Sequence, residues 1–163
     1  MKKLHLLLVV LLAVLFITGC GSKGYKNKST RTVEDLLDEY VEAYTKADVE
    51  LAKDLFPPFY VEYAKNVLTT ERLEQGLKNS KERYGDDFNI TYEVTGKTKY
   101  TDEELETLNK KMESYYNSKD NATECYKFEG TITFKGSKEE DPDPLTTMAY
   151  CKYDGSWYLV GVN

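Results

Sequence analysis

Residues 145–162 have the sequence LTTMAYCKYDGSWYLVGV and carry the clearest structural signal in the chain. The dipeptide Asp154-Gly155 stands between two stretches rich in apolar and aromatic residues. Asp-Gly in this setting is a strong signal for a two-residue β-hairpin turn. The sequence therefore predicts a hairpin formed by residues 145–153 and 156–162.

Two segments before the hairpin alternate apolar and polar residues with a period of two, as half-buried strands do. They are residues 88–95 and 125–134. The stretch 136–144 is acidic and contains two prolines, so it is expected to form a loop. Together with the hairpin, these segments give four strands.

The N-terminal part has helical periodicity instead. Residues 33–44 place apolar side chains three and four positions apart, and Thr32 with Asp35 has the form of a capping box. Further helices are expected at residues 48–56, 58–67, 70–85 and 101–116. Helices followed by a mostly antiparallel sheet indicate an α+β fold.

This order of elements resembles the nuclear-transport-factor-like, or cystatin-like, α+β cone. The likeness rests on the helix at 33–44, the segment ADVELAKDLF at 47–56 and the hairpin YDGSWYLV at 153–160, and it spans about residues 32–162. The resemblance implies N-terminal helices packed on the concave face of a curved, mostly antiparallel four-stranded sheet. The helix between strands 1 and 2 is an addition to that pattern. The superfamily contains enzymes and binding modules, so the fold does not decide the function.

The first twenty residues have the organisation of an export signal. Two lysines precede an almost wholly apolar stretch at residues 4–17, which is too short for a comfortable membrane span, and small residues follow it. The sequence ITGC at 17–20 resembles the lipobox of bacterial lipoproteins, and this implies cleavage between Gly19 and Cys20 and acyl chains such as palmitate on Cys20. The alternatives are an ordinary signal peptide, or an uncleaved anchor, with a chance cysteine.

The lipobox resemblance divides the chain into three parts. Residues 1–19 are the expected lipoprotein signal peptide, 20–31 the acylated cysteine with a flexible basic tether, and 32–163 a single α+β domain. Small lipoproteins of Gram-positive bacteria have this organisation. The expected location is the cell membrane, lipid-anchored and facing outside the cytoplasm, with the membrane itself as a partner.

Acylation of Cys20 leaves Cys125 and Cys151, which lie on consecutive predicted strands. Pairing them also places Tyr126 opposite Tyr150, and Phe128 opposite Met148, so that the apolar faces match. An extracytoplasmic compartment permits a disulfide between them. Two separate thiols are the alternative, and a metal site is poorly supported because soft ligands are too few.

Several kinds of chemistry have no residues to support them. His5 is the single histidine and lies in the expected signal peptide, so histidine-dependent catalysis and histidine–metal sites are not expected. Glycine-rich phosphate loops are absent, and no cofactor or metal is predicted. The net charge of −6, without a basic stripe, argues against nucleic acid as a partner.

The 14 tyrosines are the remaining lead. An apolar cleft with a few phenol hydroxyls suits a small organic ligand, whereas tyrosines can also simply fill a core. The aromatic residues expected to converge on a pocket between the helices and the sheet are Tyr40, Tyr44, Phe59, Tyr63, Tyr92, Phe128, Tyr150 and Trp157.

We favour a non-catalytic binding or interaction domain in the cell envelope, whose partner is a small ligand or an envelope protein. One alternative is a cone-fold enzyme, of isomerase or dehydratase type, using a buried carboxylate and tyrosines. The other is a structural module that forms a homodimer. Its contact would be the outer face of the sheet, at Thr147, Ala149, Cys151, Tyr158 and Val160.

Overall fold

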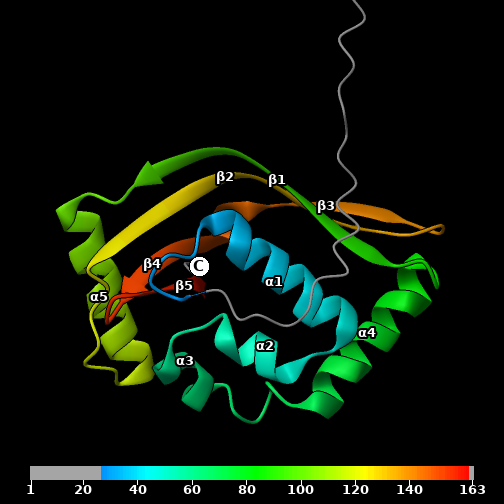
Figure 1. The fold of residues 1–163 in the computed structure, drawn as a ribbon, viewed down its shortest axis with the longest axis horizontal. Helices are drawn as coiled ribbons and strands as arrows, with labels where there is room; N and C mark the ends of the chain where they lie inside the picture. The colour runs from blue at the N-terminus through cyan, green and yellow to red at the C-terminus, as the bar shows by residue number, and fades with distance from the viewer. Residues whose placement is uncertain (1–26, 162–163) are drawn as a thin grey trace, which may run out of the picture.

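The computed structural model describes residues 27–161 as an α+β domain with five α-helices and a curved antiparallel sheet (Figure 1). The predicted signal peptide, its predicted cleavage site and Cys20 lie outside these residues, as does Val162 at the end of the predicted hairpin. Within residues 27–161, no helix has the length and apolar character to cross a membrane. The predicted fold class is confirmed.

The sheet is built around one long strand, β2 (Glu124–Lys135). One edge of β2 pairs along its length with β1 (Asn89–Lys99). The other edge is shared, with β3 (Glu140–Pro144) beside the second half of β2 and β4 (Met148–Tyr153) beside the first half. Strand β5 (Ser156–Gly161) pairs with β4 and completes the order β1-β2-β4-β5.

The predicted loop at 136–144 is wrong in its second half, where β3 pairs with β2. Strand β3 has β2 on one side only, and an edge position tolerates proline because one side of the backbone has no ladder to complete. The start of the hairpin also differs, since Leu145–Thr147 forms a 3-10 turn (η1) and β4 begins at Met148.

The predicted hairpin turn is confirmed. Asp154 and Gly155 have φ values of 46° and 72°, both in the left-handed region that a type I′ turn requires. The register expected from the cysteines is also confirmed where the strands pair, with Cys125 opposite Cys151 and Tyr126 opposite Tyr150. The ladder ends one pair later, so Phe128 and Met148 are not paired.

A glycine permits the bend of the long strands. Gly130 has a φ of 146°, and a Cβ atom there would lie 1.9 Å from the carbonyl oxygen of Glu93. The β1–β2 register shifts beside this point, between Val94 and Gly96. In Figure 1 the two strands curve over the first helix, which lies on their concave side.

The helices begin at the residues that the sequence marks as caps. Helix α1 (Val33–Lys46) and helix α5 (Asp102–Tyr116) each have a complete capping box, at Thr32 and Thr101. Helix α2 (Val49–Asp54) is capped by Asp48, and helix α4 (Thr70–Tyr84) by Thr69. Helix α3 (Pro58–Tyr63) starts with proline in its first turn, where no backbone donor is needed.

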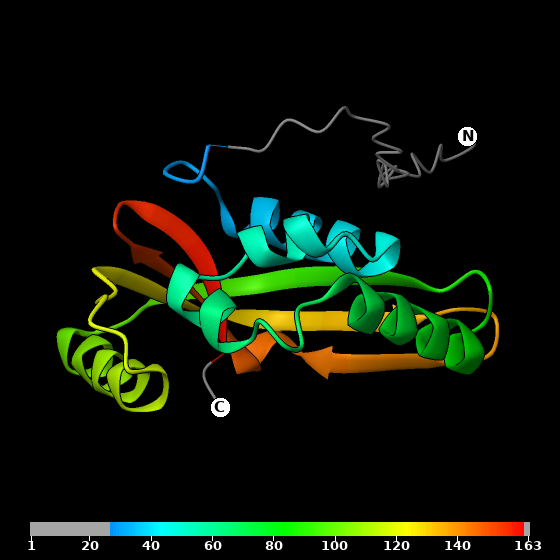
Figure 2. The same cartoon turned by 90° about the horizontal axis from the view of Figure 1, so that it is seen from below.

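The sheet is covered on both faces. Along β4, Tyr150 belongs to the main core under α1, whereas Ala149 and Cys151 belong to a second core with Leu108 and Met112 of α5. Because neighbouring side chains on a strand point to opposite faces, the two cores lie on opposite sides of the sheet. Figure 2 shows α1 and α5 on these two sides.

The second core corrects the predicted dimer surface. Four of its five residues, Ala149, Cys151, Tyr158 and Val160, are buried inside the chain, and Thr147 is exposed. Alternation identified an outward face of the sheet, but α5 of the same chain covers it. This face is therefore not free to bind a second copy.

The segment before α1 is also part of the fold, so the predicted domain start at Thr32 is too late. The Trp157 amide of β5 donates to the Lys28 carbonyl at 2.9 Å, and the Leu159 amide donates to the Leu55 carbonyl at 2.9 Å. These bonds occupy the outer edge of β5. Arg31, expected in the flexible tether, is only 2% exposed.

Candidate functional site

Most of the predicted pocket residues form core packing. Phe128 and Tyr150 are buried, and Trp157 stacks on Tyr150 with ring centroids 4.1 Å apart and an interplanar angle of 9°. The rings of Tyr40 and Tyr44 are in tilted contact along α1, with centroids 4.5 Å apart. Together with Tyr92, these residues belong to or pack against one core cluster. Six of the eight residues predicted to line a pocket therefore pack in or against the main core.

Tyr92 contacts a carboxylate, and a pairing of tyrosine with a buried carboxylate is what the enzyme alternative requires. Its hydroxyl donates to Asp38 Oδ1 at 2.7 Å and lies 3.2 Å from the Glu34 carbonyl oxygen. Burial raises the pKa of Tyr92, and the hydrogen bond to Asp38 raises it further. Asp38 is exposed, so this pair is not a buried carboxylate among tyrosines.

Two concavities of the described surface lie away from all eight predicted pocket residues. One is on α4 and includes Leu77, Lys81 and Lys138, and the other lies along α5 and includes Leu105 and Asn109. Most of the side chains that line them are charged or polar. Within residues 27–161 there is no cluster of three or more side chains that could hold a metal ion.

The remaining two predicted pocket residues, Phe59 and Tyr63, lie elsewhere, against the C-terminal end of α5. Tyr116 is at the centre of this group, with ring centroids 5.6 Å from Phe59, 5.7 Å from Tyr60 and 4.9 Å from Tyr63. Tyr115 lies 6.5 Å from Tyr116. We call this group the α3–α5 aromatic surface; its members are Phe59, Tyr60, Tyr63, Tyr115 and Tyr116.

The outer part of this surface faces solvent. Among the described residues, the exposed large apolar side chains are Tyr63 at 67%, Tyr115 at 67% and Val67 at 57%, and the two tyrosines belong to the α3–α5 aromatic surface. Isolated exposed apolar residues are ordinary, but a group on one surface indicates an interaction site. Tyrosine is also enriched at protein interfaces and at membrane interfaces.

The inner part of the surface is held by packing. Phe59 contacts Tyr153 of β4 edge to face, at 5.3 Å, and so links α3 to the second core. Burial raises the pKa of Tyr116, as do its neighbours Tyr60 and Tyr63. The exposed tyrosines therefore stand on a packed aromatic base.

The residues predicted to line a pocket include Phe59 and Tyr63 of this surface. The signal that could have found the others is the apolar content around helix α3, which extends beyond one face and continues to Val67, together with the adjacent pair Tyr115-Tyr116. Adjacent tyrosines on a helix cannot both point to the core. Their meeting with α3, however, depends on contacts between segments more than fifty residues apart.

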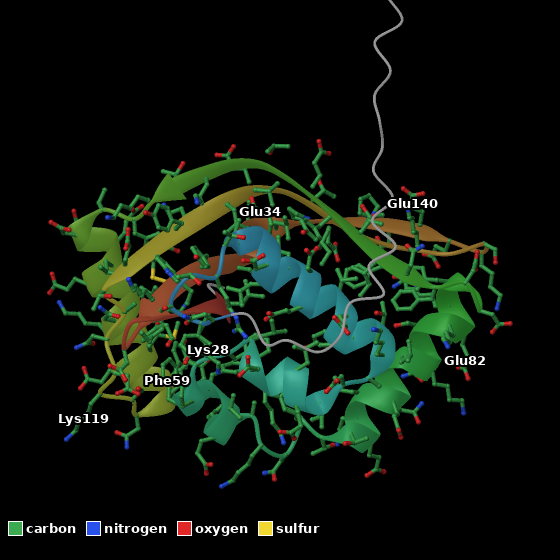
Figure 3. The ribbon with its side chains drawn as sticks, viewed as in Figure 1. Lys28, Glu34, Phe59, Glu82, Lys119 and Glu140 are labelled. Carbon is green, nitrogen blue, oxygen red and sulfur yellow. A yellow bond between two sulfur atoms is a disulfide. The ribbon has the colours of Figure 1, made fainter. Side chains whose placement is uncertain are left out.

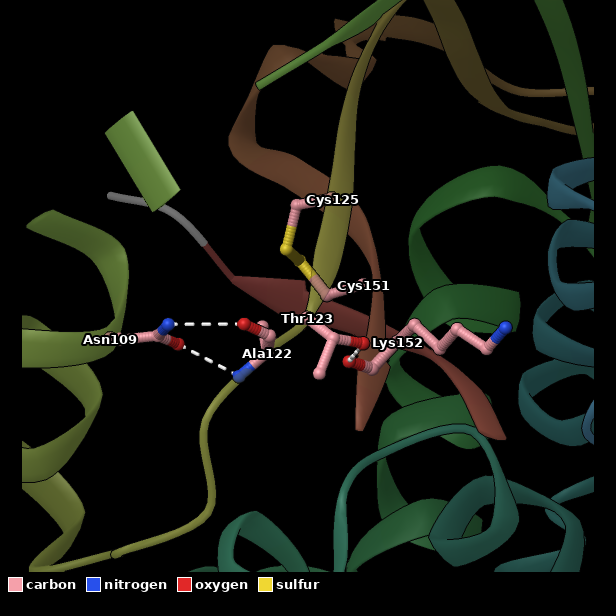
Figure 4. The surroundings of a disulfide bond; sticks show 6 residues. All are labelled: Asn109, Ala122, Thr123, Cys125, Cys151 and Lys152. Atoms are coloured by element: carbon pink, nitrogen blue, oxygen red, sulfur yellow. Dashed lines mark hydrogen bonds between the residues drawn. A yellow bond between two sulfur atoms is a disulfide. The ribbon is translucent and has the colours of Figure 1, made fainter. Parts of the chain in front are cut away.

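The disulfide joins the two strands beneath the second core (Figure 4). Cys125 and Cys151 are bonded, with Cα atoms 4.1 Å apart, and both are buried. Next to them, the Asn109 side chain of α5 donates to the Ala122 carbonyl at 3.1 Å and accepts from the Ala122 amide at 2.8 Å. This pair fixes the chain entering β2 against the helix that carries Tyr115 and Tyr116.

Comparison with known proteins gives no relative, because no protein family, curated protein or solved structure matches this chain.

Proposed function

We propose that this chain is a membrane-anchored, extracytoplasmic lipoprotein whose folded domain is a non-catalytic interaction module. Its interaction site is the α3–α5 aromatic surface. The observation that carries the proposal is that two of the three exposed large apolar side chains among residues 27–161, Tyr63 and Tyr115, lie beside the same ring, that of Tyr116.

The anchor is supported by the sequence. A basic start, an apolar stretch and the segment ITGC at 17–20 are the features by which lipoproteins are recognised and acylated. A disulfide between Cys125 and Cys151 fits the same location, since disulfides persist outside the reducing cytoplasm. The order of helices and strands supports a relationship to the nuclear-transport-factor-like superfamily.

The choice of a surface over an internal pocket follows from the packing. The space between α1 and the sheet holds Phe128, Tyr150 and Trp157 in mutual contact, so it offers a core instead of a ligand cleft. A rigid group of tyrosines at the surface offers large contact area at a low cost in side-chain entropy.

Acylation is tested by labelling the full chain with a palmitate analogue in a Gram-positive host. The parent chain is expected to incorporate the label, to fractionate with membranes and to be degraded by protease added to cells whose wall has been removed. A Cys20→Ala variant should lose the label and leave the membrane fraction. A variant that stays membrane-bound in the parental amount would contradict the anchor.

The interaction site is tested separately, with the acylated chain purified in detergent. Hydrogen exchange of helix α3 and the end of α5 is compared between detergent and native membranes. We expect helix α3 and the end of α5 to exchange more slowly in membranes than in detergent, and α4 to exchange equally in both. Equal exchange in both states would contradict the assignment of this surface.

A further inference from the structure

The attachment of the N-terminal segment limits how far the domain can move from its anchor. Lys28 is tied to β5 through its carbonyl and to Asp54 through its ammonium group, and Arg31 is buried beside it. Only residues 21–26 separate Cys20 from Asn27, the first described residue. A chain of that length spans at most about 25 Å. An acylated Cys20 would therefore hold this end of the domain close to the lipid surface.

The α3–α5 aromatic surface lies at the same end of the molecule. Lys28 Nζ lies 5.4 Å from the ring centre of Tyr158, and from there ring contacts continue through Tyr153 and Phe59 to Tyr116. Each step in this series is between 5.3 and 6.5 Å. In Figures 1 and 2, the N-terminal segment, the β4–β5 turn, α3 and α5 all lie at one end, and α4 lies at the other.

Figure 3 places Lys28, Phe59 and Lys119 at the end with the aromatic surface, and Glu82 and Glu140 at the opposite end. Both ends carry charges of both signs: α5 holds five carboxylates and two lysines, and at the opposite end Arg83 pairs with Glu139 and Asp141. Docking on a bilayer is therefore favoured by the position of the anchor and by the exposed tyrosines, and not by charge.

We propose that the α3–α5 aromatic surface docks on the lipid bilayer that holds Cys20, with Tyr63 and Tyr115 entering the headgroup region. This inference rests on the proposed lipid anchor. Tyrosine suits such a position because its ring is apolar and its hydroxyl remains in contact with water or headgroups. Docking would fix the orientation of the domain, so that the β3–α4 end faces away from the membrane.

The test uses single tryptophans in the full acylated chain. Variants Tyr63→Trp, Tyr115→Trp and Glu82→Trp are reconstituted in vesicles of phosphatidylglycerol and phosphatidylcholine, with and without bromine on the acyl chains. Glu82 is the matched control because its side chain is also 67% exposed and lies at the opposite end. All variants retain Trp157 as a common background.

Bromine is expected to reduce the added emission at positions 63 and 115 by about twofold or more, because aromatic rings at headgroup level lie next to the upper part of the acyl chains. The added emission at position 82 should be unchanged. Vesicle flotation distinguishes the two ways of failing. A chain that floats with the vesicles but shows no quenching at 63 and 115 overturns the docking and leaves the anchor intact. A chain that does not float overturns both.

A protein partner is the competing occupant of this surface. A photo-reactive residue at position 63 in membranes would then form a cross-link to protein and none to lipid. That result, with unquenched emission at 63, overturns bilayer docking. Circular dichroism of each variant, unchanged from the parent, establishes that the substitutions leave the fold intact.

Discussion

Arg31 Nη1 donates a hydrogen bond to the backbone carbonyl of Asp54 at 3.0 Å, so a residue before the first helix is fixed to the end of the second. The other terminal nitrogen contacts the Asp54 carboxylate and lies 3.1 Å from Glu39 Oε2. Lys28 joins this buried group of charges at its edge. The group lies where the chain passes from the proposed tether into the folded domain.

Replacing Arg31 with methionine is expected to destabilise the domain by about 3–5 kcal/mol, because Glu39 and Asp54 lose their buried counter-charge. The measurement is urea unfolding of the parent and the variant. Lys46→Ala is the control, because it removes an exposed pair with Glu42 and should cost less than about 1 kcal/mol. Equal effects of the two substitutions would contradict a structural role for Arg31.

Stability should fall in acid partly through Asp54. Burial alone would raise the pKa of Asp54, but hydrogen bonds from Lys28 and Arg31 outweigh it and hold the pKa below the ordinary value of 3.8. A carboxyl whose pKa is lowered by folding stabilises the protein above its unfolded pKa, and this contribution disappears as pH falls through the folded pKa. Between pH 7 and pH 3, Asp54→Asn should therefore lose less stability than the parent. Parallel pH profiles of the two proteins would count against this explanation.

Gly130→Ala should be among the most damaging single substitutions. The added Cβ would lie 1.9 Å from the Glu93 carbonyl oxygen, in a backbone conformation that alanine avoids. We expect a loss of more than about 2 kcal/mol, or failure to fold. Gly76→Ala in α4 is the matched control, since nothing lies within 4 Å of its Cβ position, and it should gain about 0.5–1 kcal/mol. Thermal unfolding of both variants decides the point.

Removing the disulfide should lower stability by about 2–4 kcal/mol, because it joins residues separated by 26 positions and limits the unfolded chain. The double variant Cys125→Ala/Cys151→Ala tests this by denaturant unfolding, with reduction of the parent as an independent measurement. Denatured but unreduced parent protein should react with no thiol reagent at these positions. Full labelling of Cys125 and Cys151 would show that the disulfide does not form in the purified chain.

Truncation of a buried aromatic residue should lower stability much more than truncation of an exposed one. Phe128→Ala in the main core is expected to cost about 3–5 kcal/mol. Tyr63→Ser and Tyr115→Ser should each change the stability of the detergent-solubilised chain by less than about 1 kcal/mol, because their side chains are mostly exposed. A large loss of stability in either surface variant would assign these tyrosines a structural role.

The type of most elements could be predicted from local sequence. Helix starts at Thr32 and Thr101, the turn at Asp154-Gly155 and the pairing of Cys125 with Cys151 each depend on residues within one element or one strand pair. Strand β3 was missed because its two prolines and its acidic residues are unfavourable in a strand, although it forms a local hairpin with β2 across residues 136–139. The sequence also did not show that residues 27–31 pack against β5 and α2, because these contacts join segments that are distant in the chain.

The candidate site depended far more on the tertiary structure. Sequence alone determined that the chain is rich in tyrosine, that its first twenty residues have the pattern of an export signal ending at a cysteine, and that its strands have two distinguishable faces. Only the packing of the helices decided that Tyr150 is core, that α5 covers the face at Ala149 and Cys151, and that Tyr63 meets Tyr116 at the surface. Periodicity shows which side chains share a face, because it is set by local backbone geometry, whereas what covers that face is set by segments distant in the chain.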